Sequence, residues 1–176
     1  YASLAKLNPQ LIYGDITGYG PDDERPAFDM VLQAEAGFLY MTGEKDGAPV
    51  KMPVALIDLL AAHQLKEGIL LALLQREKTG LGTKVSVSLY ATALASLANQ
   101  ATNWLIAGKI PQRMGTLHPN IAPYGELLEC NDGGQIVLAV GNDRQFQLLC
   151  KTLDLEVLAQ APQYLDNKQR VLNRQE

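Results

Sequence analysis

The feature that most constrains the fold is a long helical segment, Leu59 to Lys78, whose residues are apolar on nearly every side as far as Leu74. A surface helix carries a polar stripe that faces water, so a helix without one needs neighbours around most of its circumference. Basic side chains and then Gly80 follow the segment, as is usual at a helix C-terminus. The pattern therefore predicts a helix that is buried on most sides.

Two segments that flank this helix have the patterns of β-strands. Leu11 to Ile16 is a short apolar run that ends in a glycine turn, and residues 83–88 alternate with a period of two. Helical spacing covers Phe28 to Tyr40 and again Leu89 to Ala107, where we expect Trp104 in the core. The order strand, helix, helix, strand, helix predicts an α/β domain with a largely parallel sheet.

The composition of the chain changes after Gly108. Residues 109–123 are rich in proline and predict an extended linker. Residues 124–130 and 135–140 then flank an Asn-Asp-Gly-Gly sequence, and two strands around an Asp-Gly turn form a β-hairpin.

A small α+β unit completes the chain. Asn142 is suited to cap a helix over residues 143–153, and we expect further helix from Leu155 to the end. The predicted organisation is part of a large domain at residues 1–108, the linker at 109–123, and part of a small domain at 124–176.

Composition limits the functions that the chain can have. It has 176 residues, of which 47% are hydrophobic and 19% charged, so it can form a core. Its net charge of −4 and a pI near 5.2 argue against binding of nucleic acid. No apolar run is long enough to cross a membrane.

Cysteine and histidine are too sparse for a disulfide scaffold or a metal site. Cys130 and Cys150 form no CxxC motif, and neither His63 nor His118 has a neighbouring ligand in the sequence. We therefore expect reduced thiols, a cytoplasmic location and no bound metal.

Asp58 is the strongest candidate for chemistry, because it stands where a short apolar stretch gives way to the long helix. As an N-cap, its carboxylate would accept hydrogen bonds from amides of the first helical turn. The same position favours negative charge and points a carboxylate out of the turn, so in a water-poor cleft it would serve as a nucleophile. The residue pattern leaves both roles open, and they are compatible.

Two other segments are candidates for ligand binding. Gly18-Tyr19-Gly20 follows a strand, where a glycine turn lets a ligand approach the backbone, although a plain tight turn has the same pattern. Arg25 has a side chain suited to phosphate, or it is simply solvated. Gly115 to Tyr124 offers His118 and Asn120 in a proline-stiffened segment, which also suits an interdomain linker.

A series of longer motifs runs in order along nearly the whole chain. They are Asn8-Pro9-Gln10-Leu11-Ile12-Tyr13, Gly18-Tyr19-Gly20, Arg25-Pro26-Ala27-Phe28-Asp29, Leu56-Ile57-Asp58-Leu59, Glu77-Lys78-Thr79-Gly80-Leu81-Gly82, His118-Pro119-Asn120-Ile121-Ala122-Pro123-Tyr124 and Ala139-Val140-Gly141-Asn142-Asp143-Arg144-Gln145-Phe146. Together they resemble the class III CoA transferases, the family of formyl-CoA transferase and carnitine-CoA transferase. The ordered series is more specific than any single motif in it.

The resemblance implies a Rossmann-like large domain with parallel strands, followed by a linker and a small α+β domain. It implies longer subunits that form an interlocked homodimer, and no tightly bound cofactor. The chain would then be an internal fragment, as its start at Tyr1 and its end at Glu176 also suggest. Segments outside it would supply much of the CoA pocket, so we expect the fragment alone to be inactive.

By the same resemblance, Asp58 corresponds to the catalytic aspartate. It would form an anhydride with the donor acyl group, then an aspartyl-CoA thioester, from which an acceptor carboxylic acid takes the CoA. We expect a dicarboxylate as the acceptor. The residues implied to bind CoA or substrate are Gly18, Tyr19, Gly20, Arg25, Pro26, Ala27, Phe28, Asp29, Gly115, His118 and Asn120.

Two of these positions depart from a family pattern. The segment from Gly115 to Asn120 corresponds to a mobile glycine-rich loop in formyl-CoA transferase but has far fewer glycines. Phe28 occupies the position of a histidine in the α-methylacyl-CoA racemases, which share the fold. Since a phenyl ring transfers no proton, a racemase or epimerase is the weaker alternative. A paralogue that only binds CoA esters is the third.

Overall fold

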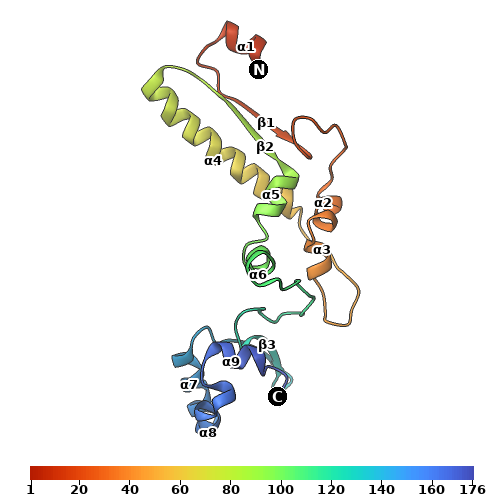
Figure 1. Cartoon of the computed structure of the whole chain (residues 1–176), viewed down its shortest axis with the longest axis vertical. Helices are drawn as coiled ribbons and strands as arrows, with labels where there is room; N and C mark the ends of the chain where they lie inside the picture. Colours follow the sequence, from red (N-terminus) through yellow and green to blue (C-terminus); the bar gives the residue numbers. More distant parts are fainter. The chain divides into compact units, whose positions relative to one another are not determined.

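The computed structural model describes residues 1–176, which form two compact units. The first comprises residues 1–43 with 47–113, and the second comprises residues 44–46 with 114–176. Figure 1 labels their helices and strands, and each unit is described by itself. No helix in the chain has both the length and the apolar character needed to cross a membrane.

The first unit contains a parallel pair of strands and six helices. Its elements are α1 (Ala2–Leu7), β1 (Tyr13–Thr17), α2 (Asp29–Glu35), α3 (Phe38–Met41), α4 (Leu56–Thr79), β2 (Lys84–Ser88), α5 (Leu89–Ala95) and α6 (Asn99–Ala107). Strands β1 and β2 pair in parallel, with Tyr13 opposite Lys84 and Thr17 opposite Ser88. The prediction of an α/β fold with parallel strands is confirmed.

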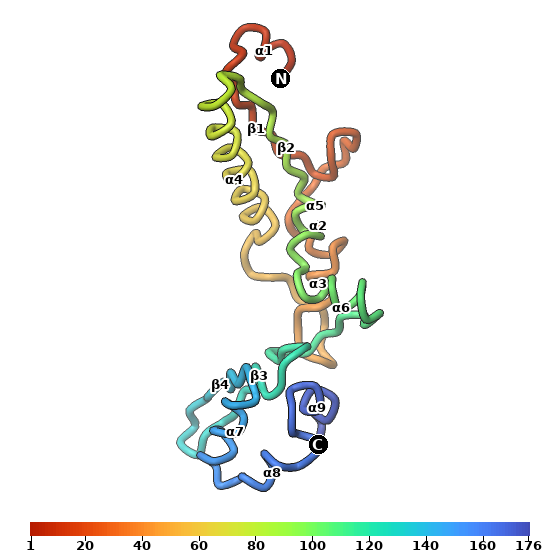
Figure 2. The backbone as a smooth tube through the Cα atoms, turned by 60° about the vertical axis from the view of Figure 1, so that its left-hand side comes forward, coloured from red at the N-terminus to blue at the C-terminus, as the bar shows by residue number.

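Helix α4 lies along this strand pair, as Figures 1 and 2 both show. Glycines make the close approach possible: a β-carbon on Gly68 would lie 2.4 Å from Cγ1 of Val85 on β2. A β-carbon on Gly14 of β1 would likewise lie 3.2 Å from Cδ1 of Leu65. The first distance is too short for a real contact and the second is unusually tight, so the absence of side chains at these positions lets the helix lie close to the strands.

The two helices predicted around this pair are each broken. The segment from Phe28 to Tyr40 divides at Gly37, which has a φ of 89° and separates α2 from α3. The segment from Leu89 to Ala107 divides between Ala95, where α5 ends, and Ala98, the N-cap residue of α6, which has a φ of 50°. Glycine adopts such a φ without strain, whereas alanine does so rarely, so only the first break has a signal in the sequence.

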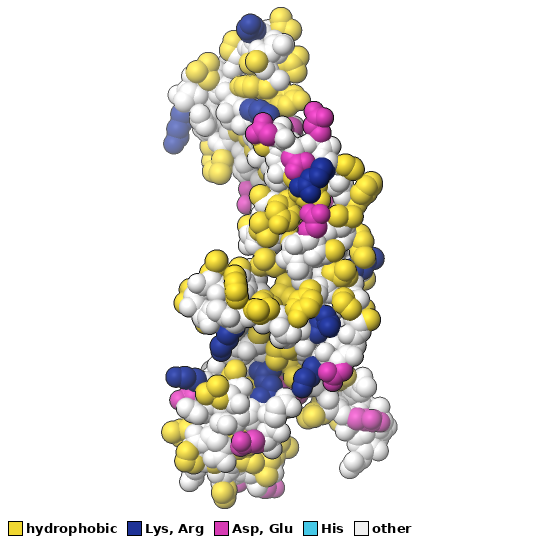
Figure 3. Space-filling view, turned by 45° about the vertical axis from the view of Figure 1, so that its right-hand side comes forward, with side chains coloured by type: hydrophobic (Ala, Val, Ile, Leu, Met, Phe, Trp, Pro, Cys, Tyr) yellow, Lys and Arg dark blue, Asp and Glu magenta, His cyan; other side chains and the backbone are white.

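The prediction that α4 is buried on most sides is wrong for this chain. Only Ile57, Ala61 and Ala72 of the helix are buried, and Leu71 and Leu74 are 67% and 63% exposed. The physical reason is that a two-stranded sheet covers one face of a helix and leaves the opposite face open. Apolar side chains elsewhere in the chain also reach the surface, and they gather in the middle of the face shown in Figure 3.

The second unit contains an antiparallel hairpin and short helices. Its elements are β3 (Tyr124–Glu129), β4 (Gln135–Ala139), α7 (Asp143–Thr152), α8 (Glu156–Gln160), the 3₁₀ helix η1 (Pro162–Tyr164) and α9 (Asn167–Leu172). The predicted hairpin and the cap at Asn142, whose side chain accepts from the Gln145 amide at 2.9 Å, are confirmed. The helix expected after Leu155 is present only as three short pieces.

Candidate active site

Asp58 lies in the first turn of α4, which begins at Leu56 and not at Leu59 as predicted. Its neighbour Ile57 is fully buried in a core cluster. The other members are Leu32 of α2, Ala36 at the C-terminal end of α2, and Ala93 of α5. The side chain of Asp58 is exposed, and its carboxylate forms no hydrogen bond or salt bridge within the chain. The buried Ile57 therefore anchors the helix start and leaves the next carboxylate free.

The N-cap interpretation of Asp58 is wrong. The N-cap residue is Ala55, which offers no capping side chain. Instead, Oδ2 of Asp29 accepts a hydrogen bond from the backbone N–H of Ile57 at 2.7 Å, across 28 residues of sequence. A carboxylate from α2 thus satisfies an amide at the N-terminus of α4, where negative charge is favoured.

Gln33 completes this arrangement, although its role was not predicted from the sequence. Its side chain is fully buried, and Nε2 donates to Oδ1 of Asp29 at 2.6 Å and to the Val54 carbonyl at 3.4 Å. Its Oε1 accepts from the Met52 amide at 2.9 Å. The spacing of four between Asp29 and Gln33 places both on one helical face, which is a signal that sequence reasoning could have used.

The environment raises the pKa of the Asp58 carboxyl above its usual value. Partial burial of the group is the larger cause, and the negative charge of Asp29 is the second. Both effects disfavour the ionised form. Because a carboxyl group is nucleophilic only when ionised, any reaction that used Asp58 in this way would gain rate as the pH rises through this raised pKa.

The effect of Asp29 on Asp58 is testable through the pH dependence of the full-length protein. Asp29→Asn removes the second cause, so we expect the acidic limb of kcat/KM to move to lower pH. Since the amide can accept only one of the two hydrogen bonds and turns a donor toward the other, we also expect a stability loss of about 1 to 3 kcal/mol. Initial rates measured across the pH range test this. Asp22→Asn, in the exposed loop before α2, should leave the limb in place. A limb that stays or rises in Asp29→Asn would contradict the assigned cause.

The glycine turn and the segment before α2 come together beside this helix start. A β-carbon on Gly18, at the carboxyl end of β1, would lie 2.6 Å from Cβ of Ala27. Tyr19 and Ala27 both pack against the cluster that holds Ile57. Gly20 has a φ of 129°, which glycine adopts without strain. The structure therefore places these segments on the same core as the anchor of Asp58.

Phe28 and Pro26 extend this surface. Phe28 is the N-cap residue of α2 and is 65% exposed, and Pro26 is also exposed. Their side chains are thus available to a ligand. Asp29, by contrast, uses both carboxylate oxygens inside the protein, so the structure occupies it with internal contacts.

Arg25 is held by neighbours and is not simply solvated. Its guanidinium donates to both carboxylate oxygens of Asp23, with Nη2 to Oδ2 at 2.8 Å, and lies 3.9 Å from the centre of the Tyr19 ring. The side chain of Arg25 is 61% exposed and that of Asp23 is 33% exposed. A phosphate would compete with Asp23 for this side chain.

The remaining predicted residues belong to the second unit. The Nδ1 atom of His118 accepts from the Asn120 amide at 3.1 Å, so a neutral ring carries its proton on Nε2. Arg174 donates to the His118 carbonyl at 2.7 Å, and Asn167 donates to the Asn120 carbonyl at 2.9 Å. Gly115 is exposed, with a φ of 58°. Side chains near the end of the chain therefore fasten this loop.

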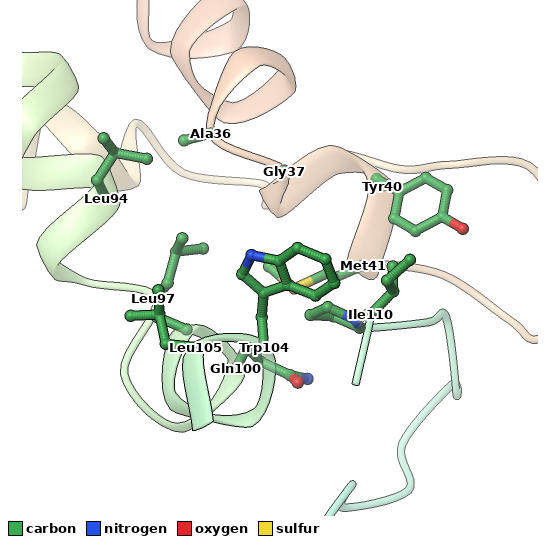
Figure 4. A pocket seen from close by; sticks show the side chains of 12 residues that line it. Ala36, Gly37, Tyr40, Met41, Leu94, Leu97, Gln100, Trp104, Leu105 and Ile110 are labelled. Carbon is green, nitrogen blue, oxygen red and sulfur yellow. The ribbon is translucent and has the colours of Figure 1, made fainter. Parts of the chain in front are cut away.

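A cavity of about 440 Å³ lies elsewhere in the first unit (Figure 4). Almost all of its lining is apolar and comes from α3, α5, α6 and residues 110–111. Trp104 stands in this lining and is 53% exposed, so its expected place in the core is wrong. None of the predicted site residues lines the cavity.

Comparison with known proteins places the chain among CoA transferases. A succinate–glutarate CoA-transferase of Agrobacterium fabrum is 41% identical over the whole chain, which covers 44% of that protein. An acetyl-CoA:oxalate CoA-transferase of Acetobacter aceti is 36% identical over 98% of the chain and 45% of its own length. The crystal structure of a CAIB/BAIF family protein from Brucella suis matches with a TM-score of 0.74 and 42% identity, over 99% of this chain and 47% of that one.

The chain thus spans less than half the length of the relatives that it matches. The family model described as CoA-transferase family III covers residues 1–176. The chain belongs to CoA-transferase family III.

Proposed function

We propose that this chain supplies the nucleophile, Asp58, of an enzyme that transfers coenzyme A from an acyl-CoA thioester to a carboxylic acid. The observation that carries the proposal is the free carboxylate in the first turn of α4, fixed by the buried Ile57 beside it. The family match and the names of the relatives support the reaction class. Because the chain is shorter than those relatives, the activity is proposed for the full-length enzyme.

In the first half of the reaction, the Asp58 carboxylate attacks the thioester carbonyl of the donor. The carbon–sulfur bond breaks, CoA leaves as a thiolate, and an aspartyl mixed anhydride forms. The thiolate then attacks the aspartyl carbonyl and displaces the donor acid as its carboxylate. The product is an aspartyl-CoA thioester at Asp58, and no proton is gained or lost.

The second half repeats these steps in reverse with the acceptor. Its carboxylate attacks the aspartyl-CoA carbonyl, releases the thiolate and forms a second anhydride. The thiolate attacks the acceptor's acyl carbon, which yields the new acyl-CoA and regenerates the Asp58 carboxylate. Water must be excluded from both anhydrides. Among residues 1–176 Asp58 is exposed, so the predicted water-poor cleft needs cover from outside this chain.

Dicarboxylates are the acceptor class that we propose. The names of the relatives include succinate, glutarate and oxalate, all of them dicarboxylates. The proposed assembly is a homodimer of full-length chains, which light scattering of the purified enzyme tests.

Mass spectrometry of an intermediate tests the function. Full-length enzyme is incubated with succinyl-CoA in the absence of acceptor, digested, and examined for CoA attached to the peptide that contains Asp58. A transferase of the proposed mechanism gives this adduct, and addition of glutarate discharges it as glutaryl-CoA. Exchange of deuterium at the α-carbon of a 2-methylacyl-CoA without any adduct would favour the racemase instead. A protein that binds CoA esters and shows neither reaction would overturn the proposal.

A further inference from the structure

The start of α4 is held from outside the helix. The helix follows the loop between Met41 and Leu56, which contains no regular helix or strand. Its own N-cap residue, Ala55, contributes no side-chain hydrogen bond. A helix start of this kind frays easily, because its first amides lack partners within the helix. Whatever fixes the direction of Asp58 must therefore come from another element.

The buried side chain of Gln33 connects that loop to α2. Its amide nitrogen donates to Asp29 at 2.6 Å and to the Val54 carbonyl at 3.4 Å, and its oxygen accepts from the Met52 amide at 2.9 Å. The side chain is 0% exposed. Burial of an amide is costly unless its polar atoms find partners, and an apolar side chain would fill the same space without that cost. A buried amide at this position therefore points to a role for its hydrogen bonds to Asp29, Met52 and Val54.

Asp29 passes this restraint on to α4. With Oδ1 bound by Gln33, its Oδ2 accepts from the Ile57 amide at 2.7 Å. Ile57 is fixed twice, by this hydrogen bond and by its fully buried side chain. Asp58 is the next residue of the same turn.

We propose that Gln33 is a positioning residue for CoA transfer: its buried amide holds Asp29 against the Ile57 N–H and thereby fixes the direction of the Asp58 carboxylate. The proposal rests on the proposed role of Asp58 as the nucleophile. Gln33 acts only through these groups and touches no substrate. A displacement of a reacting group by about 1 Å can lower a rate by about a hundredfold, so the restraint has a kinetic consequence.

Gln33→Met in the full-length enzyme tests this, since methionine fills a similar volume without hydrogen bonds. The rate constant of aspartyl-CoA formation is measured together with the final amount of adduct per chain. We expect the rate constant to fall by about tenfold to a hundredfold while the final amount stays near that of the wild type. A lower final amount with an unchanged rate constant would mean that Gln33 merely stabilises the fold, and would overturn the proposal.

Thr92→Val is the matched control. Thr92 is 1% exposed, and its hydroxyl donates at 2.9 Å to Oε1 of Gln64, which lies beyond the first turn of α4. The Thr92→Val variant loses one buried hydrogen bond at nearly constant side-chain volume. We expect its rate constant of aspartyl-CoA formation to equal that of the wild type. Equal rate constants in Gln33→Met and Thr92→Val would also overturn the proposal. Absence of the adduct in the wild type would instead defeat the proposed function itself.

Gln33→Glu provides a second test if the methionine variant fails to fold. A protonated glutamic acid can donate to Asp29 as the amide does, whereas the ionised form would repel it. The ratio of the variant rate constant to that of the wild type should therefore fall as the pH rises from about 5 to about 8, where a buried glutamate titrates. A ratio that does not change with pH would overturn the proposal.

Discussion

In Asp58→Ala of the full-length enzyme, we expect CoA transfer to fall by at least about a thousandfold, because removal of a nucleophile removes the covalent route itself. The substitution leaves the fold intact, since the carboxylate forms no hydrogen bond or salt bridge within the chain and Ile57 remains buried. Initial rates of acyl-CoA formation from a succinyl-CoA donor and a glutarate acceptor measure the loss.

Binding and stability separate this loss from a general defect. The dissociation constant for CoA and the unfolding midpoint should stay close to those of the wild type. Glu67→Ala removes another exposed carboxylate from α4 and should retain full activity. If Asp58→Ala keeps more than about a tenth of the wild-type rate, the nucleophile lies elsewhere and the mechanism is wrong.

The largest expected loss of stability comes from Arg170→Met. The guanidinium is 3% exposed and donates to the Ala122 carbonyl at 2.8 Å, the Tyr164 carbonyl at 3.1 Å and Oδ1 of Asp143 at 2.6 Å. It also lies 4.5 Å from the centre of the Phe146 ring. Methionine leaves two carbonyls without this donor, and we expect the free energy of unfolding to fall by about 2 to 4 kcal/mol.

Urea denaturation of the full-length enzyme measures this change. The half-exposed carboxylate of Asp143 regains water when Arg170 is lost, which keeps the effect below that of a fully buried pair. Lys168→Met on the same helix changes an exposed side chain and should alter the free energy by less than about 0.5 kcal/mol. Equal effects of the two substitutions would show that the Arg170 network contributes nothing.

The loop that carries His118 and Asn120 depends on this network. Asn167 and Arg170 of α9 donate to its carbonyls, and so does Arg174, two residues beyond the end of that helix. These contacts hold the segment in place. No local pattern predicts that arginines near residue 170 would donate to carbonyls about fifty residues earlier.

Several features of the chain were predictable because each depends on residues that are close in sequence. Gly80 and Gly108 end helices with positive φ values of 72° and 62°, and Asn142 caps α7, since backbone conformation and capping are local properties. The alternation in β2 and the apolar run in β1 likewise predicted the strands that pair in parallel. Periodicity also placed Asp58 at the start of the long helix, to within one turn.

The tertiary structure alone decided how that helix start is held. Capping by Asp29 joins residues 28 apart, and the contacts of Gln33 with Met52 and Val54 cross a loop without regular structure. The break before Ala98 has no signal because it places an alanine at a positive φ. Sequence patterns report which conformations a short segment prefers, whereas hydrogen bonds between distant segments depend on how the elements pack. The identity of the candidate nucleophile therefore came from the sequence, and its surroundings came from the fold.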